Sequence, residues 1–183
     1  RKETEIWRPA EIRMALEDMQ AYDPRLRLFV HLAFVCSLRS GEDLGIETKS
    51  ISFHTKELMI TQSVQRIYKT ALEEVENTKV IKVFPCQKKD SQSTVVLKEP
   101  KTPKSKRRVF LTSPLIEDIR AVIAYNEECK ARYRNKYNDY GLLFATDHGN
   151  PVTPELMDDW FKKWQKQTSL EITQITPHGL RHS

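Results

Sequence analysis

The sequence predicts an α+β fold that is mainly helical and carries a small antiparallel β-sheet. Three observations favour this class. Apolar residues recur at helical spacing in four long segments of the chain. Short stretches in which apolar and polar residues alternate lie between the second and the third of these segments, as expected of strands with one buried face. The chain has no internal repeat and no low-complexity tract, so a repeat architecture is not expected.

Length and composition indicate one globular domain over residues 1–183. The chain is 39% apolar and 30% charged, which is ordinary for a domain with a real hydrophobic core. The longest apolar run, Leu28 to Leu38, is interrupted by His31 and is too short to span a bilayer, so no membrane association is expected. No signal peptide is recognisable. The three cysteines are far apart and form no C-x-x-C pair, which suits a reducing, intracellular location.

Two helices are predicted at the start of the chain. The first spans Arg8 to Met19 and is expected to be peripheral, because its apolar residues form one stripe. The second spans Arg25 to Leu38 and is apolar around most of its circumference, so we expect it in the core. Next, the stretch SLRSGEDLGI predicts a short new helical turn with acidic residues near its start. Arg39 is thereby placed at an interruption between two helices.

Two pairs of strands are predicted in the middle of the chain. Ser50 to Val64 alternates as a hairpin with one buried face, and Ser93 to Leu111 gives a second pair joined by a basic connection that contains prolines. The basic residues are therefore expected at a hairpin tip. The stretch from Tyr68 to Gln92 is longer than a tight turn requires; its ALEEVENTK portion is compatible with a helical turn, and its role is left open.

Two further helices are predicted from cap residues followed by apolar stripes. Ser113 and Pro114 open the first, and Thr153 and Pro154 open the second. The second helix has an aromatic face opposite its lysines. An aromatic stripe at this spacing is typical of a core, so we do not interpret it as a base-stacking surface. This face comprises Leu156, Trp160, Phe161 and Trp164.

The last eight residues, TPHGLRHS, predict the start of another helix. Thr176 and Pro177 suit the cap and the first position, so His178 and Arg181 lie three residues apart on one face of the first turn. Free N–H groups and the helix dipole favour an anion there, and a phosphate is the implied ligand. Taken alone, the pattern is more typical of an ordinary surface helix start, because one His and one Arg there are commonplace. His182 forms a possible metal pair with His178, but no third ligand is apparent and no metal is expected.

The positive charge of the chain is concentrated in one place. Lys98 to Arg108, which we call the basic segment, contains six basic residues and one acidic residue, so it alone equals the net charge of +5 of the whole chain. Such a concentration is suited to neutralising phosphates. A solvated loop with surplus lysines is the alternative interpretation.

Taken in order, these motifs resemble the tyrosine recombinases. LRSGEDLGI is similar to the first arginine box of that family, with Arg39 as the arginine and Glu42 as its acidic companion. PKTPKSKRRVFL is similar to the Pro-Lys-Thr hairpin of phage and conjugative-transposon integrases, which makes Lys101 the hairpin lysine. Residues 141–164 resemble the connection of the family into its next helix, and HGLRHS supplies His178 and Arg181. The resemblance runs along nearly the whole chain.

The resemblance implies a site-specific DNA recombinase that cuts and rejoins DNA through a 3′-phosphotyrosyl intermediate. Arg39 and Arg181 are then expected to hold the nonbridging phosphate oxygens, because guanidinium groups bind them through paired N–H bonds. Glu42 is expected to orient the arginine region, His178 to assist proton transfer, and Lys101 to protonate the departing 5′ oxygen. The covalent link conserves the bond energy, so neither metal, ATP nor another cofactor is expected.

The resemblance also implies partners and a location. Double-stranded DNA recombination sites are the expected partner, and the full-length protein is expected to assemble on DNA, as a tetramer, in the bacterial cytoplasm. Further phosphate contacts are expected from the basic segment. Its candidates for this role are Thr102, Lys104, Ser105, Lys106, Arg107 and Arg108.

One feature of the family pattern is not found within the sequence. The nucleophilic tyrosine of the family follows the His-x-x-Arg box, whereas all six tyrosines here precede it. We therefore expect a catalytic domain truncated at its C-terminus, without the N-terminal core-binding domain, and inactive by itself. A non-catalytic DNA-binding relative with a regulatory or architectural role is the alternative. An unrelated phosphate-binding or RNA-binding helical domain is a more distant one, because no signature of either is present.

Overall fold

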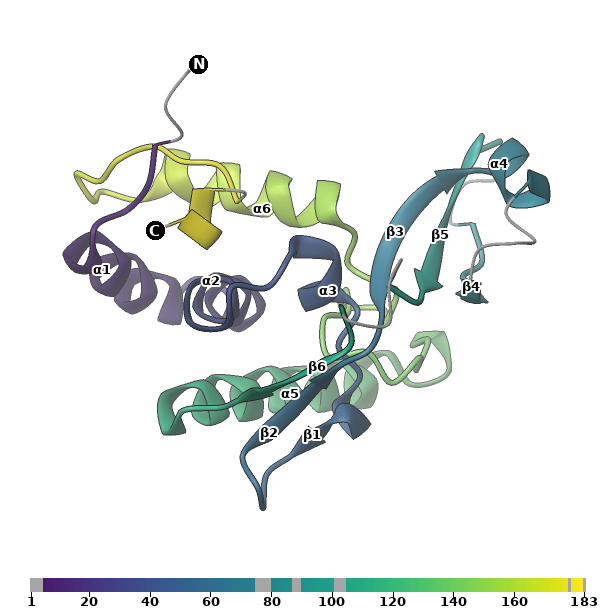
Figure 1. Ribbon diagram of the computed structural model, residues 1–183, viewed down its shortest axis with the longest axis horizontal. Helices are drawn as coiled ribbons and strands as arrows, with labels where there is room; N and C mark the ends of the chain where they lie inside the picture. Colours follow the sequence, from purple (N-terminus) through teal and green to yellow (C-terminus); the bar gives the residue numbers. More distant parts are fainter. Residues whose placement is uncertain (1–4, 75–79, 87–89, 101–104, 178, 183) are drawn as a thin grey trace.

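The computed structural model describes residues 5–74, 80–86, 90–100, 105–177 and 179–182, and within these it confirms the α+β class. Figure 1 shows helices α1, α2 and α6 gathered at one end of the molecule. The strands β3, β4 and β5 project at the other end, together with the short helix α4. Helix α3 lies between these two parts.

Four long helices form the body of the protein. They are α1 (Pro9–Gln20), α2 (Pro24–Cys36), α5 (Ser113–Tyr133) and α6 (Pro154–Gln167). Each begins with a proline in its first turn, where the missing N–H has no helical partner to lose. The predicted helices are therefore confirmed, with one difference in capping. The cap of α5 is Thr112 and not Ser113, because Ser113 already has helical backbone geometry.

The aromatic face of α6 packs in the core, as the sequence predicts. Phe161 and Trp164 are buried, and both rings contact Trp7, with centroid distances of 5.7 and 6.0 Å. The indole N–H of Trp164 donates a hydrogen bond to Asp18 of α1 at 2.7 Å. Burying an indole with its N–H satisfied avoids the cost of an unpaired donor. The first and last helices of the body are thereby held together.

The structure contains two small antiparallel sheets where the sequence predicts one. The first has the strand order β1-β2-β6 and the second has the order β3-β5-β4. The first sheet consists of β1 (Ile51–Ser52), β2 (Glu57–Ile60) and β6 (Arg107–Phe110). The second consists of β3 (Ser63–Tyr68), β5 (Ser93–Lys98) and β4 (Val80–Val83). The predicted hairpin at residues 50–64 is confirmed as β1 and β2, with Ile51 opposite Leu58.

The strands β5 and β6, which contain the two ends of the basic segment, do not form a hairpin with each other. This corrects the expectation from the sequence. β6 pairs with β2, and Ile60 lies opposite Arg107, whereas β5 pairs with β3, and Ser63 lies opposite Lys98. β2 and β3 follow each other along the chain with only residues 61 and 62 between them. The connection 99–106 therefore joins two sheets at their junction, and is not the tip of a single ribbon.

Three shorter elements differ from, or complete, the prediction. The open stretch after Tyr68 contains α4 (Lys69–Glu74), which fits the helical turn suggested by its sequence, and strand β4, which was not predicted. The expected helix after Pro177 is a 3₁₀ helix, η5 (Gly179–His182), in which the N–H of Gly179 bonds to the carbonyl of Thr176. Two further 3₁₀ turns are η1 (Thr48–Ser50) and η4 (Arg134–Lys136).

None of the helices in the described part of the chain combines the length and the apolar character needed to cross a bilayer.

Candidate active site

Arg39 lies immediately before helix α3 (Ser40–Leu44), as its N-cap residue. The chain reaches this point through Ser37, whose positive φ of 50° ends α2, and through the buried Leu38. Leu38 anchors the backbone while the side chain of Arg39 stays 63% exposed. The predicted interruption thus holds an arginine at a fixed backbone position with its guanidinium directed toward solvent.

Two glycines bring α3 against strand β3. Gly41 and Gly45 are four residues apart and therefore share one face of the helix. A Cβ atom on Gly41 would lie 2.8 Å from the carbonyl oxygen of Val64, and one on Gly45 would lie 2.9 Å from the Cα of Ser63. No larger residue fits at either position without moving backbone. The approach places the Arg39 turn next to the junction of the two sheets.

Glu42 joins two arginines at this junction. Its carboxylate accepts from the backbone N–H of Arg39 at 3.0 Å and from the Nη1 of Arg39 at 3.1 Å. It also accepts a two-pronged pair from Arg107, with distances of 3.2 Å from Nη1 and 2.9 Å from Nη2. Burial by itself raises the pKa of Glu42, but the bonds from Arg107 and Arg39 hold it below its ordinary value. Glu42 is therefore ionised near neutral pH.

An open pocket of about 550 Å³ adjoins Arg39. Its wall includes Pro100 and Ser105, the described residues on either side of residues 101–104, and Pro154, the first residue of α6. The remaining lining residues are Arg39, Ser40, Gly41, Glu42, Ser63, Val64 and Gln65. The described side-chain contacts of Arg39 use only its Nη1 atom, so the other guanidinium donors are available for an anion at this pocket.

Several predicted site residues lie outside the described part of the chain. These are Lys101, Thr102, Lys104 and His178. The backbone of Arg181 lies in η5, whereas its side chain is not described. Its neighbour Leu180 is buried in the same core as α2. Among the described residues, the structure therefore brings Arg39 and Glu42 together and places the neighbours of Lys101 at their pocket.

The described residues of the basic segment have distinct surroundings. Ser105 lines the pocket, and Lys106 pairs with Glu99 at 3.1 Å, which joins the two ends of the connection. Arg107 and Arg108 point to opposite sides because they are neighbours in a strand. Arg107 turns toward Glu42, while the side chain of Arg108 is 58% exposed and pairs with Glu57 at 3.2 Å.

Asp43 is a feature of the site region that the sequence reasoning missed. It is fully buried, and neither carboxylate oxygen has a hydrogen-bond partner among the described residues. Burial raises the pKa of Asp43 well above its ordinary value, and the charge of Glu42 raises it further. The only signal in the sequence was its place in a short helix that must be covered on most sides.

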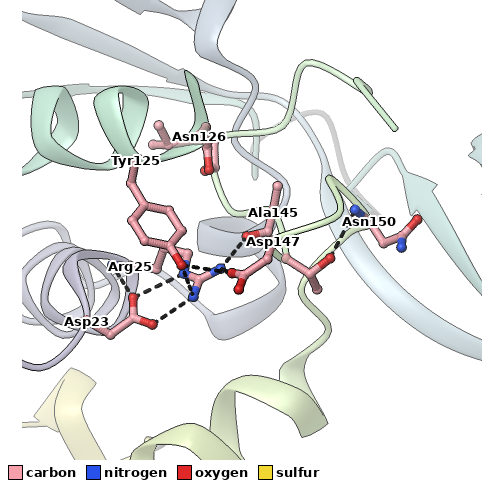
Figure 2. Close-up of polar contacts among 9 residues, drawn as sticks. Asp23, Arg25, Tyr125, Asn126, Ala145, Asp147 and Asn150 are labelled. Carbon is pink, nitrogen blue, oxygen red and sulfur yellow. Dashed lines mark hydrogen bonds and ion pairs between the residues drawn. The ribbon is translucent and has the colours of Figure 1, made fainter. Parts of the chain in front are cut away.

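A second missed feature is the polar network around Arg25, shown in Figure 2. Arg25 is 5% exposed, pairs with Asp23 at 2.8 Å and with Asp147 at 2.9 Å, and donates to the carbonyl of Ala145 at 3.0 Å. Its guanidinium also lies 4.5 Å from the ring centroid of Tyr125. This network ties the start of α2 to the turn that precedes α6. The pairing with Asp23 is local, but no local pattern predicts the pairing with Asp147, which is 122 positions away.

Within the described residues, no three His, Cys, Asp or Glu side chains are grouped so that they could hold a metal ion. His178 and the side chain of His182, the possible metal pair, lie outside the described residues.

Comparison with known proteins agrees with this architecture. A sequence profile of the phage integrase family matches residues 8–183. The tyrosine recombinase XerC-like protein of Caldanaerobacter subterraneus subsp. tengcongensis is 27% identical over 184 residues, which covers 99% of this chain and 42% of that protein. The chain thus spans less than half the length of this curated relative.

Solved structures show the same fold. The Tn1549 transposon integrase in complex with transposon right end DNA superposes with a TM-score of 0.69 at 18% identity, covering 99% of this chain and 52% of that one. XerA recombinase gives a TM-score of 0.61 at 12% identity, covering 99% and 48%. XerH recombinase bound to difH substrate gives 0.57 at 16% identity, covering 97% and 40%. The chain belongs to the phage integrase family and has the fold of a tyrosine recombinase catalytic domain.

Proposed function

We propose that this chain supplies the phosphate-binding part of the active site of a site-specific DNA recombinase, which cuts and rejoins double-stranded DNA through a 3′-phosphotyrosyl intermediate. Arg39 and Arg181 bind the scissile phosphate, Glu42 holds Arg39 in place, and His178 assists proton transfer. Lys101 protonates the departing 5′ oxygen. The nucleophile is a tyrosine that follows Arg181 in the full-length protein.

The observation that carries this proposal is the pocket at Arg39. An exposed guanidinium is fixed at its rim by a buried carboxylate, and the residues that flank the Lys101 stretch line the same pocket. A phosphodiester gains negative charge on its nonbridging oxygens when it is attacked, and a pre-positioned guanidinium stabilises that charge without reorganising.

The relatives support DNA as the partner. The Tn1549 integrase was solved in complex with transposon right end DNA, and the XerH site-specific recombinase was solved bound to its palindromic difH substrate. The charge of this chain is concentrated next to the same pocket, since Pro100 and Ser105 both belong to the basic segment. We propose that the full-length protein acts on duplex recombination sites and assembles on them into a tetramer.

A suicide-substrate assay with the full-length protein tests the function. A nicked duplex that loses a short fragment after cleavage traps the covalent protein–DNA adduct, which is counted on a denaturing gel. We expect Arg39→Ala, Lys101→Ala and Arg181→Ala each to reduce adduct formation by about 10²-fold or more, as loss of a transition-state donor does. The matched control is Arg13→Ala, which removes an exposed arginine from α1.

Two results distinguish a recombinase from a non-catalytic relative. An adduct that maps to a tyrosine after Arg181 and is lost in the three variants supports the recombinase. DNA binding without any adduct, in a protein that is folded by circular dichroism, contradicts it and indicates a non-catalytic DNA-binding relative.

A further inference from the structure

Arg107 is engaged in a way that differs from the other described cations of the basic segment. Both of its terminal nitrogens bond to the two oxygens of Glu42, at 3.2 and 2.9 Å. The side chain of Arg107 is 32% exposed, whereas that of its neighbour Arg108 is 58% exposed. A planar guanidinium that donates one hydrogen bond to each oxygen of a carboxylate has a fixed orientation. A lysine at this position cannot reproduce this two-pronged geometry.

The partner of Arg107 is the residue that positions Arg39. Glu42 is only 7% exposed and accepts both the backbone N–H and the Nη1 of Arg39. One carboxylate thus connects the first residue of β6 to the N-cap of α3. If Arg107 is removed, a buried carboxylate loses its main partner, and the remaining bonds to Arg39 must reorganise.

Arg107 also bonds to the C-terminal end of the connection 99–106. Its Nη1 donates to the carbonyl of Ser105 at 3.3 Å, and Ser105 lines the Arg39 pocket. At the other end, Lys98 lies opposite Ser63 in the sheet that contacts α3. The connection 99–106 is therefore tied at its C-terminal end to the same carboxylate that fixes Arg39.

We propose that Arg107 is a positioning residue, which acts through Glu42 to hold Ser105, at the end of the connection, and Arg39 in a fixed relation, and that it is not one of the phosphate contacts of the basic segment. The proposal rests on the proposed recombinase function for its catalytic consequence. Its structural part is independent of that function, because the ion pair links α3 and β6 in the protein without DNA.

The test compares Arg107→Gln, Arg107→Lys and Arg108→Gln in the full-length protein. DNA affinity is measured by anisotropy, and the rate of adduct formation is measured in single turnover at saturating suicide substrate. We expect Arg107→Gln to slow that rate by about tenfold or more, with a change in affinity no larger than that of Arg108→Gln, because misplacement of a catalytic group lowers the rate of the chemical step. Arg107→Lys is expected to recover part of the rate, and Arg13→Gln to leave it unchanged.

Hydrogen exchange of the backbone amides separates this proposal from the function. In Arg107→Gln, we expect faster exchange at the N–H of Arg39 and at residues 105 and 106, and no such change in Arg108→Gln. If the wild type forms no adduct, the recombinase proposal fails while this measurement still decides the structural link. The positioning role is overturned if Arg107→Gln weakens affinity but leaves the saturated rate and the amide exchange as in the wild type.

Discussion

The burial of Asp43 without a hydrogen-bond partner among the described residues is expected to lower the free energy of unfolding. Both carboxylate oxygens are buried without a partner in the described chain, next to the ionised Glu42. Burial raises the pKa of Asp43 well above its ordinary 3.8, Glu42 raises it further, and Arg107 only partly opposes this. Folding therefore takes up a proton at Asp43. Its contribution to stability is complete below the ordinary carboxyl pKa and is lost as the pH rises through the folded-state pKa.

Replacing Asp43 by leucine is expected to stabilise the protein at pH 7, by about 1–3 kcal/mol, because an unpaired buried polar group is removed. The gain is expected to shrink as the pH falls toward the ordinary carboxyl pKa of 3.8, because the unfolded chain then also begins to protonate Asp43, which is already protonated in the folded protein. Urea unfolding of the two proteins between pH 4 and pH 8 measures this difference. Groups with a lowered pKa, such as Asp118, are common to both proteins and cancel.

Asp159→Leu, at an exposed position of α6, is the control for the general effect of losing a charge. If the Asp43→Leu variant were less stable than the wild type at every pH, Asp43 would have a favourable partner, and the prediction would be wrong.

At the scale of single residues, the sequence predicted the place of Arg39 and Glu42 but not the pairing of Arg107. Glu42 follows Arg39 by three positions, so their contact is local and can be anticipated from helix geometry. Arg107 is 65 positions from Glu42, and its contact depends on β6 pairing with β2. Alternation with the half-buried Val109 was the one local sign that Arg107 turns inward.

Among the structural elements, the turn before α6 depends on Gly149 more than its sequence reveals. Gly149 has a φ of +79°, and a Cβ at this position would lie 2.1 Å from the carbonyl oxygen of Asn138. Gly141 has a similar φ of +71°, but a Cβ there would meet nothing within 4 Å. A substitution at Gly141 therefore tests the effect of the positive φ alone, whereas one at Gly149 adds a steric overlap.

We expect Gly141→Ala to lower the free energy of unfolding by about 1 kcal/mol through the positive φ alone. Gly149→Ala is expected to cost about 1–3 kcal/mol more, because the backbone of the turn must also move. Thermal and urea denaturation of the two variants give the comparison. Equal losses for both would contradict the close approach of Gly149 to Asn138.

Helices were easier to predict than sheet pairing, for a physical reason. The apolar stripe and the cap of α6 are contained within neighbouring residues, and Thr153 indeed accepts a hydrogen bond from the N–H of Leu156. Strand partners are chosen by distant segments. β5 and β6 are consecutive in the chain, and their sequences predicted one hairpin. In the structure, β5 pairs with β3 and β6 pairs with β2.

For the whole molecule, the placement of charge predicts how the proposed DNA binding responds to salt. The net charge of +5 equals that of the basic segment, which borders the Arg39 pocket at Ser105. Each phosphate neutralised by a cation releases counterions, so the logarithm of the binding constant falls with the logarithm of the salt concentration, with a slope of roughly −0.9 per contact. The slope therefore reports the number of phosphates that the basic side chains neutralise.

We expect the double substitution Lys104→Ala and Lys106→Ala to make this slope shallower by about 1.8, and to weaken binding to every duplex sequence alike. Lys162→Ala with Lys163→Ala removes the same charge from exposed positions on α6 and is expected to leave the slope unchanged. Fluorescence anisotropy with labelled duplexes between about 50 and 200 mM salt, a range in which such contacts are resolved, measures both. Equal effects of the two double variants would mean that net charge alone attracts DNA. A larger effect at Lys104 and Lys106 would instead indicate that the basic segment contacts the phosphate backbone, as the proposed function requires.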